Sequence, residues 1–412
     1  MGIFGPRREP GEPHPRREPR YPGPLTLAGV EEIFRGCVDF TKRPVAIEGG
    51  PTLTLCYLTG MVKMERVSDY VLRPLAQDKS LAGCADMGAL MKKMEDGALY
   101  NLSAAERTTL DQAAFDLVSG WCLLFFPGES AVLSLFTGTE EKRSISAPSN
   151  ETVLKGARDA FVESLRTNTS IVRRHIKAPE LRIREQTVGR QSATLVDILY
   201  IEGLTDPALV KRVAAQLADI DIDAVLATGN IEEYIVPAQR TPFPLLQYTE
   251  RSDRFCAGLA EGRVGILIDG LPLGYLAPGV LGDFLRAPQD KSESWMLATV
   301  LTLLRYTCML LTLLLPALYV AMVTFHQEMI PTKLALSIIA AKQDVPFRSA
   351  FEVIVLLLAF EILQEAGLRL PQSIGQTVSI IGGLVVGSAA VEAKIVSPAV
   401  LIVVAVAGIA GY

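Results

Sequence analysis

Residues 351–398 are apolar enough to enter a bilayer but carry four glutamates, and this combination limits what the chain can fold into. Nine of the eleven residues in Val353–Leu363 are Val, Ile, Leu or Phe, which favours insertion by about 3–5 kcal/mol. One central acid costs about 2.5–3.5 kcal/mol, so two or three cancel the gain. We therefore expect this helix to have protein partners or a water-filled space for its carboxylates. A soluble amphipathic or interfacial helix is the alternative.

The acids of this region are the candidate functional residues. Glu361 and Glu365 are spaced four apart and share one face of a helix. We predict that these two residues and Glu392 line a polar conduit and act in ion movement rather than in ligand binding. Pairing of Glu365 with Arg369, one turn away, is the structural alternative.

A second apolar segment, Gln372–Val391, has twenty residues without a charge, close to the length that crosses a bilayer. Gly383 and Gly387 form a G-x-x-x-G pattern, which lets helix backbones approach closely. We predict a close helix contact on this face. General packing inside one subunit, subunit association and a pore lining all remain compatible with the pattern.

Further apolar runs predict a multi-span helical membrane domain. Tyr306–Phe325 is charge-free, with Pro316 as a kink site and Arg305 at its edge, where that side chain can reach the interface. Thr332–Ala341 is too short to cross, so it is interfacial or re-entrant. Ile395–Tyr412 is again charge-free. Because the sequence stops inside this run, we expect that it is truncated and that further spans follow.

Charge is distributed very unevenly along the 412 residues. Most of it lies in residues 1–290, and the net charge of −5 does not favour nucleic-acid binding. The six cysteines form no C-x-x-C pair and indicate reduced thiols. No signal peptide is visible, so we expect the N-terminal part to be cytoplasmic.

The sequence shows no convincing catalytic, cofactor or metal site. Its three histidines are far apart, which does not favour a histidine metal centre or a catalytic triad. Asp219, Asp221 and Asp223 suggest a metal site, and with it a membrane-anchored enzyme. No glycine bend or further ligand follows them, so a solvated charge run is favoured.

Four regions are expected from these patterns. Residues 1–25 are a disordered Pro/Arg tail, 26–145 and 146–292 are two α/β subdomains, and 293–412 are the membrane helices. Helices are predicted at 27–40, 104–118, 153–165 and 206–220. Strands are predicted at 52–58, 121–126, 131–136, 181–187, 195–200, 263–269 and 272–276.

An ordered series of short motifs from residue 150 onward resembles the A subunits of the GerA-type spore germinant receptors. Two departures are Ser252, where the family commonly has Pro, and Lys291–Trp295 before the first span. The matching segments are Asp159–Thr169, Ile171–Ile176, Val188–Arg190, Tyr200–Gly203, Pro242–Pro244, Thr249–Arg251, Glu261–Val264, Ile268–Pro272, Ile330–Leu334, Gln364–Pro371 and Val391–Ala393.

The resemblance implies a non-enzymatic subunit in the spore inner membrane, with a two-part cytosolic N-terminal domain. It implies assembly with a transporter-like B subunit and a lipoprotein C subunit, homo-oligomerisation and contact with membrane lipid. The implied role is to couple germinant sensing to ion release. A paralogue beside the dipicolinate-release channel is an alternative. A secondary transporter is another, but the inverted repeats typical of one are not visible.

Overall fold

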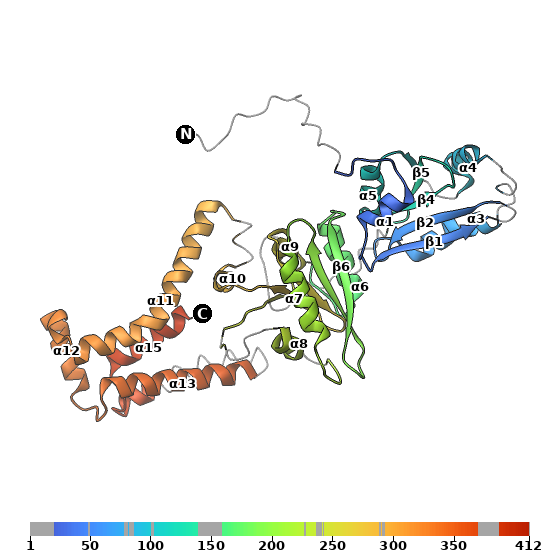
Figure 1. The fold of residues 1–412 in the computed structure, drawn as a ribbon. Coiled ribbons are helices and arrows are strands. Elements are labelled where there is room, and N and C mark those ends of the chain that lie inside the picture. Colours follow the sequence, from blue (N-terminus) through green and yellow to red (C-terminus); the bar gives the residue numbers. More distant parts are fainter. Residues whose placement is uncertain are drawn as a thin grey trace, which may run out of the picture. The chain divides into compact units, whose positions relative to one another are not determined.

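The computed structural model divides into two compact units, Met1–Phe284 and Leu285–Tyr412. It describes residues 20–47, 50–77, 81, 86–99, 103–138, 159–225, 228–235, 241, 243–287, 290, 293–369 and 387–411. Figure 1 shows the order of the elements along the chain. The expected N-terminal tail, apart from residues 20–25, and the expected linker near residue 145 lie outside the described residues.

The first unit contains two five-stranded antiparallel sheets. The first sheet has the order β1-β2-β4-β5-β3. The predicted hairpin around residues 127–130 is confirmed, because β4 and β5 pair with Leu124 opposite Leu133. Its strands are β1 (Phe40–Ala46), β2 (Thr52–Leu58), β3 (Ala104–Arg107), β4 (Trp121–Phe125) and β5 (Val132–Phe136).

Helices cover both faces of this sheet. Leu55 packs into a core with α2, η1, α3 and α4, whereas its neighbour Cys56 packs into a second core with α1 and α5, as strand alternation requires. The helices are α1 (Leu27–Ile33), α2 (Met64–Val67), η1 (Ser68–Leu72), α3 (Arg73–Gln77), α4 (Met87–Lys93), η2 (Met94–Ala98) and α5 (Leu110–Val118).

Two helices predicted in this part are shorter than expected. The 27–40 helix ends at Ile33, and Gly36 then takes a positive φ of 74° before β1 begins. The 104–118 prediction is wrong at its start, because residues 104–107 form edge strand β3 and the helix begins only at Leu110. Thr109 caps that helix by accepting a hydrogen bond from the Gln112 N–H.

The second sheet has the order β6-β7-β9-β10-β8 and is also covered on both faces. The predicted strand pairs around residues 189–190 and 270–271 are confirmed by the antiparallel ladders β6–β7 and β9–β10. Its strands are β6 (Leu181–Val188), β7 (Thr194–Ile201), β8 (Gln247–Thr249), β9 (Val264–Ile268) and β10 (Gly274–Ala277).

Helices α7 and α8 pack on one face of this sheet, and α6 and α9 pack on the other. Residues 159–164, expected to be helical, are not, and α6 begins where the predicted helix was to end. The bounds are α6 (Leu165–His175), α7 (Pro207–Ala218), α8 (Thr228–Ile235), α9 (Ser252–Ala260) and α10 (Leu281–Leu285).

The second unit is helical, and α15 packs against both α11 and α13 (Figure 1). The expected span 306–325 is part of a longer helix that begins at Trp295 and continues through Pro316. Among the described residues, α11 is the one helix long and apolar enough to cross a membrane. The bounds are α11 (Trp295–Thr324), η4 (Gln327–Met329), α12 (Thr332–Lys342), α13 (Ser349–Arg369) and α15 (Pro398–Ala410).

Candidate functional site

Glu352, in the first turn of α13, is the one buried carboxylate among the described residues of the helical unit, with only 1% of its surface exposed. One of its oxygens accepts a 2.8 Å hydrogen bond from the backbone N–H of Ser397, the residue that precedes α15. The other lies 3.3 Å from Nζ of Lys342, the last residue of α12. A single side chain therefore joins α12, α13 and the start of α15.

This junction contains polar atoms with unused hydrogen-bonding capacity. In the part of the chain that the structure describes, Tyr319 Oη and Ser397 Oγ are buried and have no hydrogen-bond partner, and Glu352 Oε1 has only its ion pair with Lys342. Tyr319 comes from α11, so α11, α12, α13 and the start of α15 all contribute to this junction. The surrounding side chains are apolar, including Val353 and Val400. A buried charge in such surroundings is tolerated only while it is paired.

The sequence contains one signal that points to this site, the start of helix α15. Ser397-Pro398 is a typical start of a helix, and the first backbone N–H groups of a helix need acceptors. Glu352 supplies one of them from a different helix. Only the folded chain shows which of the glutamates in this region does so.

The three predicted conduit residues lie elsewhere. Glu361 and Glu365 are exposed on α13, and Glu392 is exposed shortly before α15. At 1.5 Å per residue, Glu361 lies about 14 Å further along the helix than Glu352. The structure therefore does not bring these acids into the buried junction, and their role in a conduit stays a prediction. The Arg369 side chain lies outside the described part.

Small residues permit close helix packing in this unit. A Cβ added at Gly387 would lie 3.2 Å from Cδ1 of Leu401 on α15, and one at Gly408 would lie 2.7 Å from Cζ of Phe360 on α13. Gly383 lies outside the described residues, so the predicted G-x-x-x-G contact is not tested. The Gly408–Phe360 contact was not anticipated from the sequence.

Arg305 borders the expected span but lies inside the longer helix α11, and it pairs with Asp290 through a 3.0 Å hydrogen bond from Nη2. That hydrogen bond lowers the pKa of Asp290. The ion pair gives this arginine a protein partner near the N-terminal end of the helix. A charged residue can therefore lie inside this helix, so the charge at position 305 did not mark where α11 begins.

A second buried pair joins the two sheets of the first unit. Arg173 of α6 donates two hydrogen bonds, of 2.9 and 3.0 Å, to Asp39, which directly precedes β1. Both side chains are almost completely buried. Removing one partner of such a pair leaves an uncompensated charge in the interior. The pair acts beside other contacts between the two parts of this unit, such as the hydrogen bond from the Val38 N–H to the Ile183 carbonyl.

Asp197 of β7 is completely buried near this interface, and neither of its carboxylate oxygens has a hydrogen-bond partner among the described residues. Arg166 Nη1 lies 3.7 Å away. Burial raises the pKa of Asp197 to about 7, and Glu185, Asp39 and Asp269 add to the rise, while Arg166 opposes it. Asp197 was not singled out by its sequence, because alternation in an apolar strand does not reveal a buried acid.

The acidic run at the end of α7 lies at the surface, and one of its acids is paired with an arginine. Asp219 ends the helix, and Asp221 lies 2.6 Å from Arg190 at the surface. Within the described ranges, no group of three or more His, Cys, Asp or Glu side chains is placed to hold a metal ion.

The fold combines an α/β region of two sheets with a helical region in which, among the described residues, one helix is long and apolar enough to cross a membrane. The model of the family described as "Bacillus/Clostridium GerA spore germination protein" matches residues 28–412. The chain belongs to this family.

Several curated relatives are similar to it. Spore germination protein KA of Bacillus subtilis is 38% identical over 87% of this chain and 65% of its own length. Spore germination protein GerLA of Bacillus cereus is 35% identical over 91% of this chain and 75% of its own. One solved structure is also similar: the N-terminal domain of the A subunit of the Bacillus megaterium spore germinant receptor GerK3. Its sequence is 30% identical, and the match has a TM-score of 0.49 and covers 62% of this chain and 94% of that one.

Proposed function

We propose that this chain is the A subunit of a nutrient-germinant receptor in the spore inner membrane, with its α/β unit in the cytoplasm. The observation that carries the proposal is the family match over residues 28–412. Relatives named as spore germination proteins, which match most of this chain, support it. The proposed role is to couple germinant sensing to ion release, and it includes no catalytic step.

The helical unit is proposed to be a multi-span membrane domain. Helix α11 has 30 residues, about 45 Å of helix, which exceeds the roughly 30 Å hydrocarbon core. Helix α13 has 21 residues but carries Glu352, Glu361 and Glu365. Since acids facing lipid oppose insertion, we infer that α13 enters the membrane only within an assembly, in which its exposed acids face water or protein.

That assembly is proposed to contain further copies of this chain, a transporter-like B subunit and a lipoprotein C subunit. Exposed leucines and isoleucines on α11 and α13, such as Leu303, Leu313 and Ile362, leave surface for lipid and for partner helices. Glu361, Glu365 and Glu392, also exposed, are proposed to line the conduit formed between copies.

The experiment for the overall role uses spores that lack the gene. After addition of single nutrients, release of monovalent cations is followed with an ion-selective electrode. We expect the deletion to abolish release for at least one nutrient and the intact gene to restore it. Unchanged release for a full panel of amino acids and sugars, with loss of dipicolinate release alone, would instead support a role beside the dipicolinate channel.

The conduit residues are tested by neutralisation. Glu361→Gln, Glu365→Gln and the double variant should keep normal protein abundance but change the rate or selectivity of cation release. The control is Glu328→Gln, which alters an exposed acid in η4. Normal release at normal abundance in all variants would contradict a conduit role, and reduced abundance of Glu365→Gln alone would favour its pairing with Arg369.

A further inference from the structure

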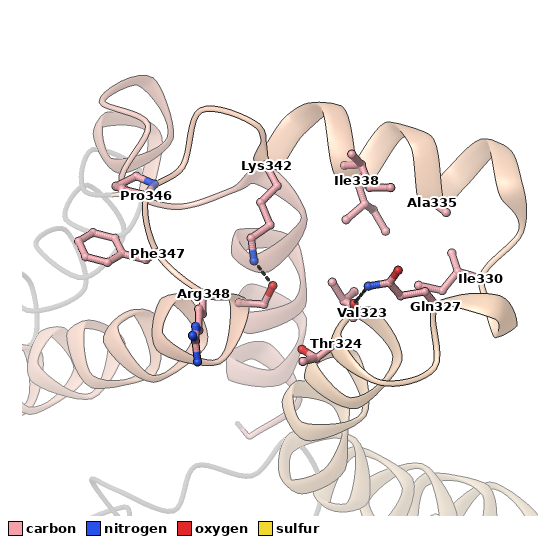
Figure 2. A pocket seen from close by; sticks show the side chains of 12 residues that line it. Val323, Thr324, Gln327, Ile330, Ala335, Ile338, Lys342, Pro346, Phe347 and Arg348 are labelled. Atoms are coloured by element: carbon pink, nitrogen blue, oxygen red, sulfur yellow. Dashed lines mark hydrogen bonds between the residues drawn. The ribbon is translucent and has the colours of Figure 1, made fainter.

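A pocket of about 430 Å³ lies where the end of α11, η4, α12 and the start of α13 meet (Figure 2). Val323 and Thr324 of α11 form part of its wall, and Ile338 of α12 forms another part. The whole pocket lies inside the helical unit. The pocket lies beside the last turn of α11, the helix long enough to cross a membrane.

The lining combines two cations with a group of apolar side chains on the opposite wall. Figure 2 shows Lys342 and Arg348 together on one side, while Ala335, Ile338 and Ile330 lie on the other. No carboxylate is present among the twelve side chains that line the pocket. This arrangement matches a molecule that has an anionic end and an apolar end.

The two cations differ in how far they are already neutralised. Lys342 lies 3.3 Å from Glu352 and donates a hydrogen bond to Ser349. Arg348 is exposed, and no carboxylate in the described ranges pairs with it. The nearby Asp344 is 2.6 Å from Lys394 and is thus engaged elsewhere. The pocket consequently retains an uncompensated positive charge on Arg348.

The helix beside the pocket has the features of an interfacial element. Helix α12 has 11 residues, about 16 Å of length, too short to cross a bilayer, and none of its residues is buried. Leu334, Leu336 and Ile339 are each more than half exposed. A helix too short to cross is expected to be interfacial or re-entrant, and an interfacial placement would bring the two cations level with lipid phosphates.

We propose that this pocket binds an anionic phospholipid, with the headgroup phosphate on Arg348 and an acyl chain along the apolar side formed by Ala335 and Ile338. A guanidinium can hold a phosphate through two parallel hydrogen bonds, and the volume admits the phosphate and the first part of a chain. The proposal rests on membrane insertion of this unit, which is part of the proposed function.

The experiment uses the full chain in detergent and native mass spectrometry after incubation with phosphatidylglycerol or phosphatidylcholine. We expect retention of phosphatidylglycerol to exceed that of phosphatidylcholine at least fivefold. Arg348→Gln should remove most of this preference. Ala335→Trp, which fills the apolar side without altering charge, should lower retention of phosphatidylglycerol.

Lys333→Gln is the matched control, since Lys333 is an exposed cation of α12 that does not line the pocket. Equal losses for Arg348→Gln and Lys333→Gln, or equal retention of both lipids by the unaltered chain, would overturn the proposal. Displacement of the lipid by millimolar glycerol phosphate would show a free-phosphate site instead. Flotation with vesicles tests membrane insertion separately. A chain that does not float contradicts the proposed function, whereas a chain that floats but shows no lipid preference contradicts only the lipid site.

Discussion

A carboxylate that leaves water needs either a partner or a proton, and two buried acids of this chain represent these two cases. Glu352 has Lys342 and the Ser397 N–H as partners. Asp197 has an arginine only at 3.7 Å, and its pKa is raised to about 7. The first acid therefore connects helices, and the second makes the stability of its unit depend on pH.

The Glu352 junction predicts an asymmetric response to substitution. Lys342→Met should destabilise the protein by about 3–5 kcal/mol, because it leaves a buried carboxylate without a cation. The double variant Lys342→Met/Glu352→Gln should recover part of this loss. Thermal unfolding in detergent measures both, with the exposed Lys333→Met as the control. A double variant no more stable than Lys342→Met would contradict the ion-pair explanation.

Asp197 predicts a pH dependence with a definite sign. The unfolded chain loses this proton near pH 3.9, whereas the folded chain keeps it up to about pH 7. The free energy of unfolding should therefore fall as pH rises from about 4 to 7. Asp197→Asn should remove this fall, a difference on the order of 4 kcal/mol at neutral pH.

Urea unfolding at several pH values compares this variant with Asp221→Asn, which alters an exposed acid at the surface. If Asp197→Asn and the unaltered protein show the same slope between pH 4 and 7, Asp197 is not the group responsible.

At the scale of elements, close packing depends on small residues at particular positions. In the second sheet, a Cβ at Gly265 would lie 2.3 Å from Cζ of Phe255, so α9 can seat an aromatic ring directly on β9. In the helical unit, Gly408 accommodates Phe360 in a similar way. Both contacts place an aromatic side chain against a backbone that has no side chain of its own.

Gly408→Leu should therefore separate α15 from α13, because even its Cβ would lie 2.7 Å from the Phe360 ring. We expect a loss of stability of about 1–3 kcal/mol, typical of overpacking, and lower protein abundance. Ala405→Leu on the exposed side of the same helix is the control. Similar abundance and thermal midpoints for the two variants would exclude the close contact.

At the scale of the whole molecule, the two units differ in how much of their apolar surface they bury within themselves. The first unit has its own cores on both faces of two sheets. The helical unit leaves many large apolar side chains exposed, including Trp295 and Leu313. The first unit is therefore expected to fold in water, whereas the second requires lipid or partner chains.

A fragment of residues 20–287 should be soluble and unfold cooperatively without the helices. In that fragment, Arg173→Met should cost about 3–5 kcal/mol, because it leaves Asp39 buried without its cation. The double variant Arg173→Met/Asp39→Asn should recover part of the loss. Urea unfolding tests this, and an unchanged stability of Arg173→Met would show that the pair does not matter.

Local patterns in the sequence determined much of the secondary structure. Alternating apolar residues located β2, since an alternating strand has one set of side chains per face. Apolar runs on either side of turn residues located the hairpin β4–β5 and both hairpins of the second sheet. They did not locate β3, an edge strand of four residues, or the start of α11, which a charged residue interrupts. Ordered motifs were sufficient to identify the family.

The identity of the buried acids was decided only by the tertiary structure. Glu352, Glu361 and Glu365 lie on one helix and have the same chemistry, yet only Glu352 is placed beneath the start of α15 and beside Lys342. Asp39 and Arg173 are 134 residues apart and meet only because two sheets pack together. The sequence reveals that a charge must be sheltered, whereas the partner that shelters it is set by contacts between segments distant along the chain.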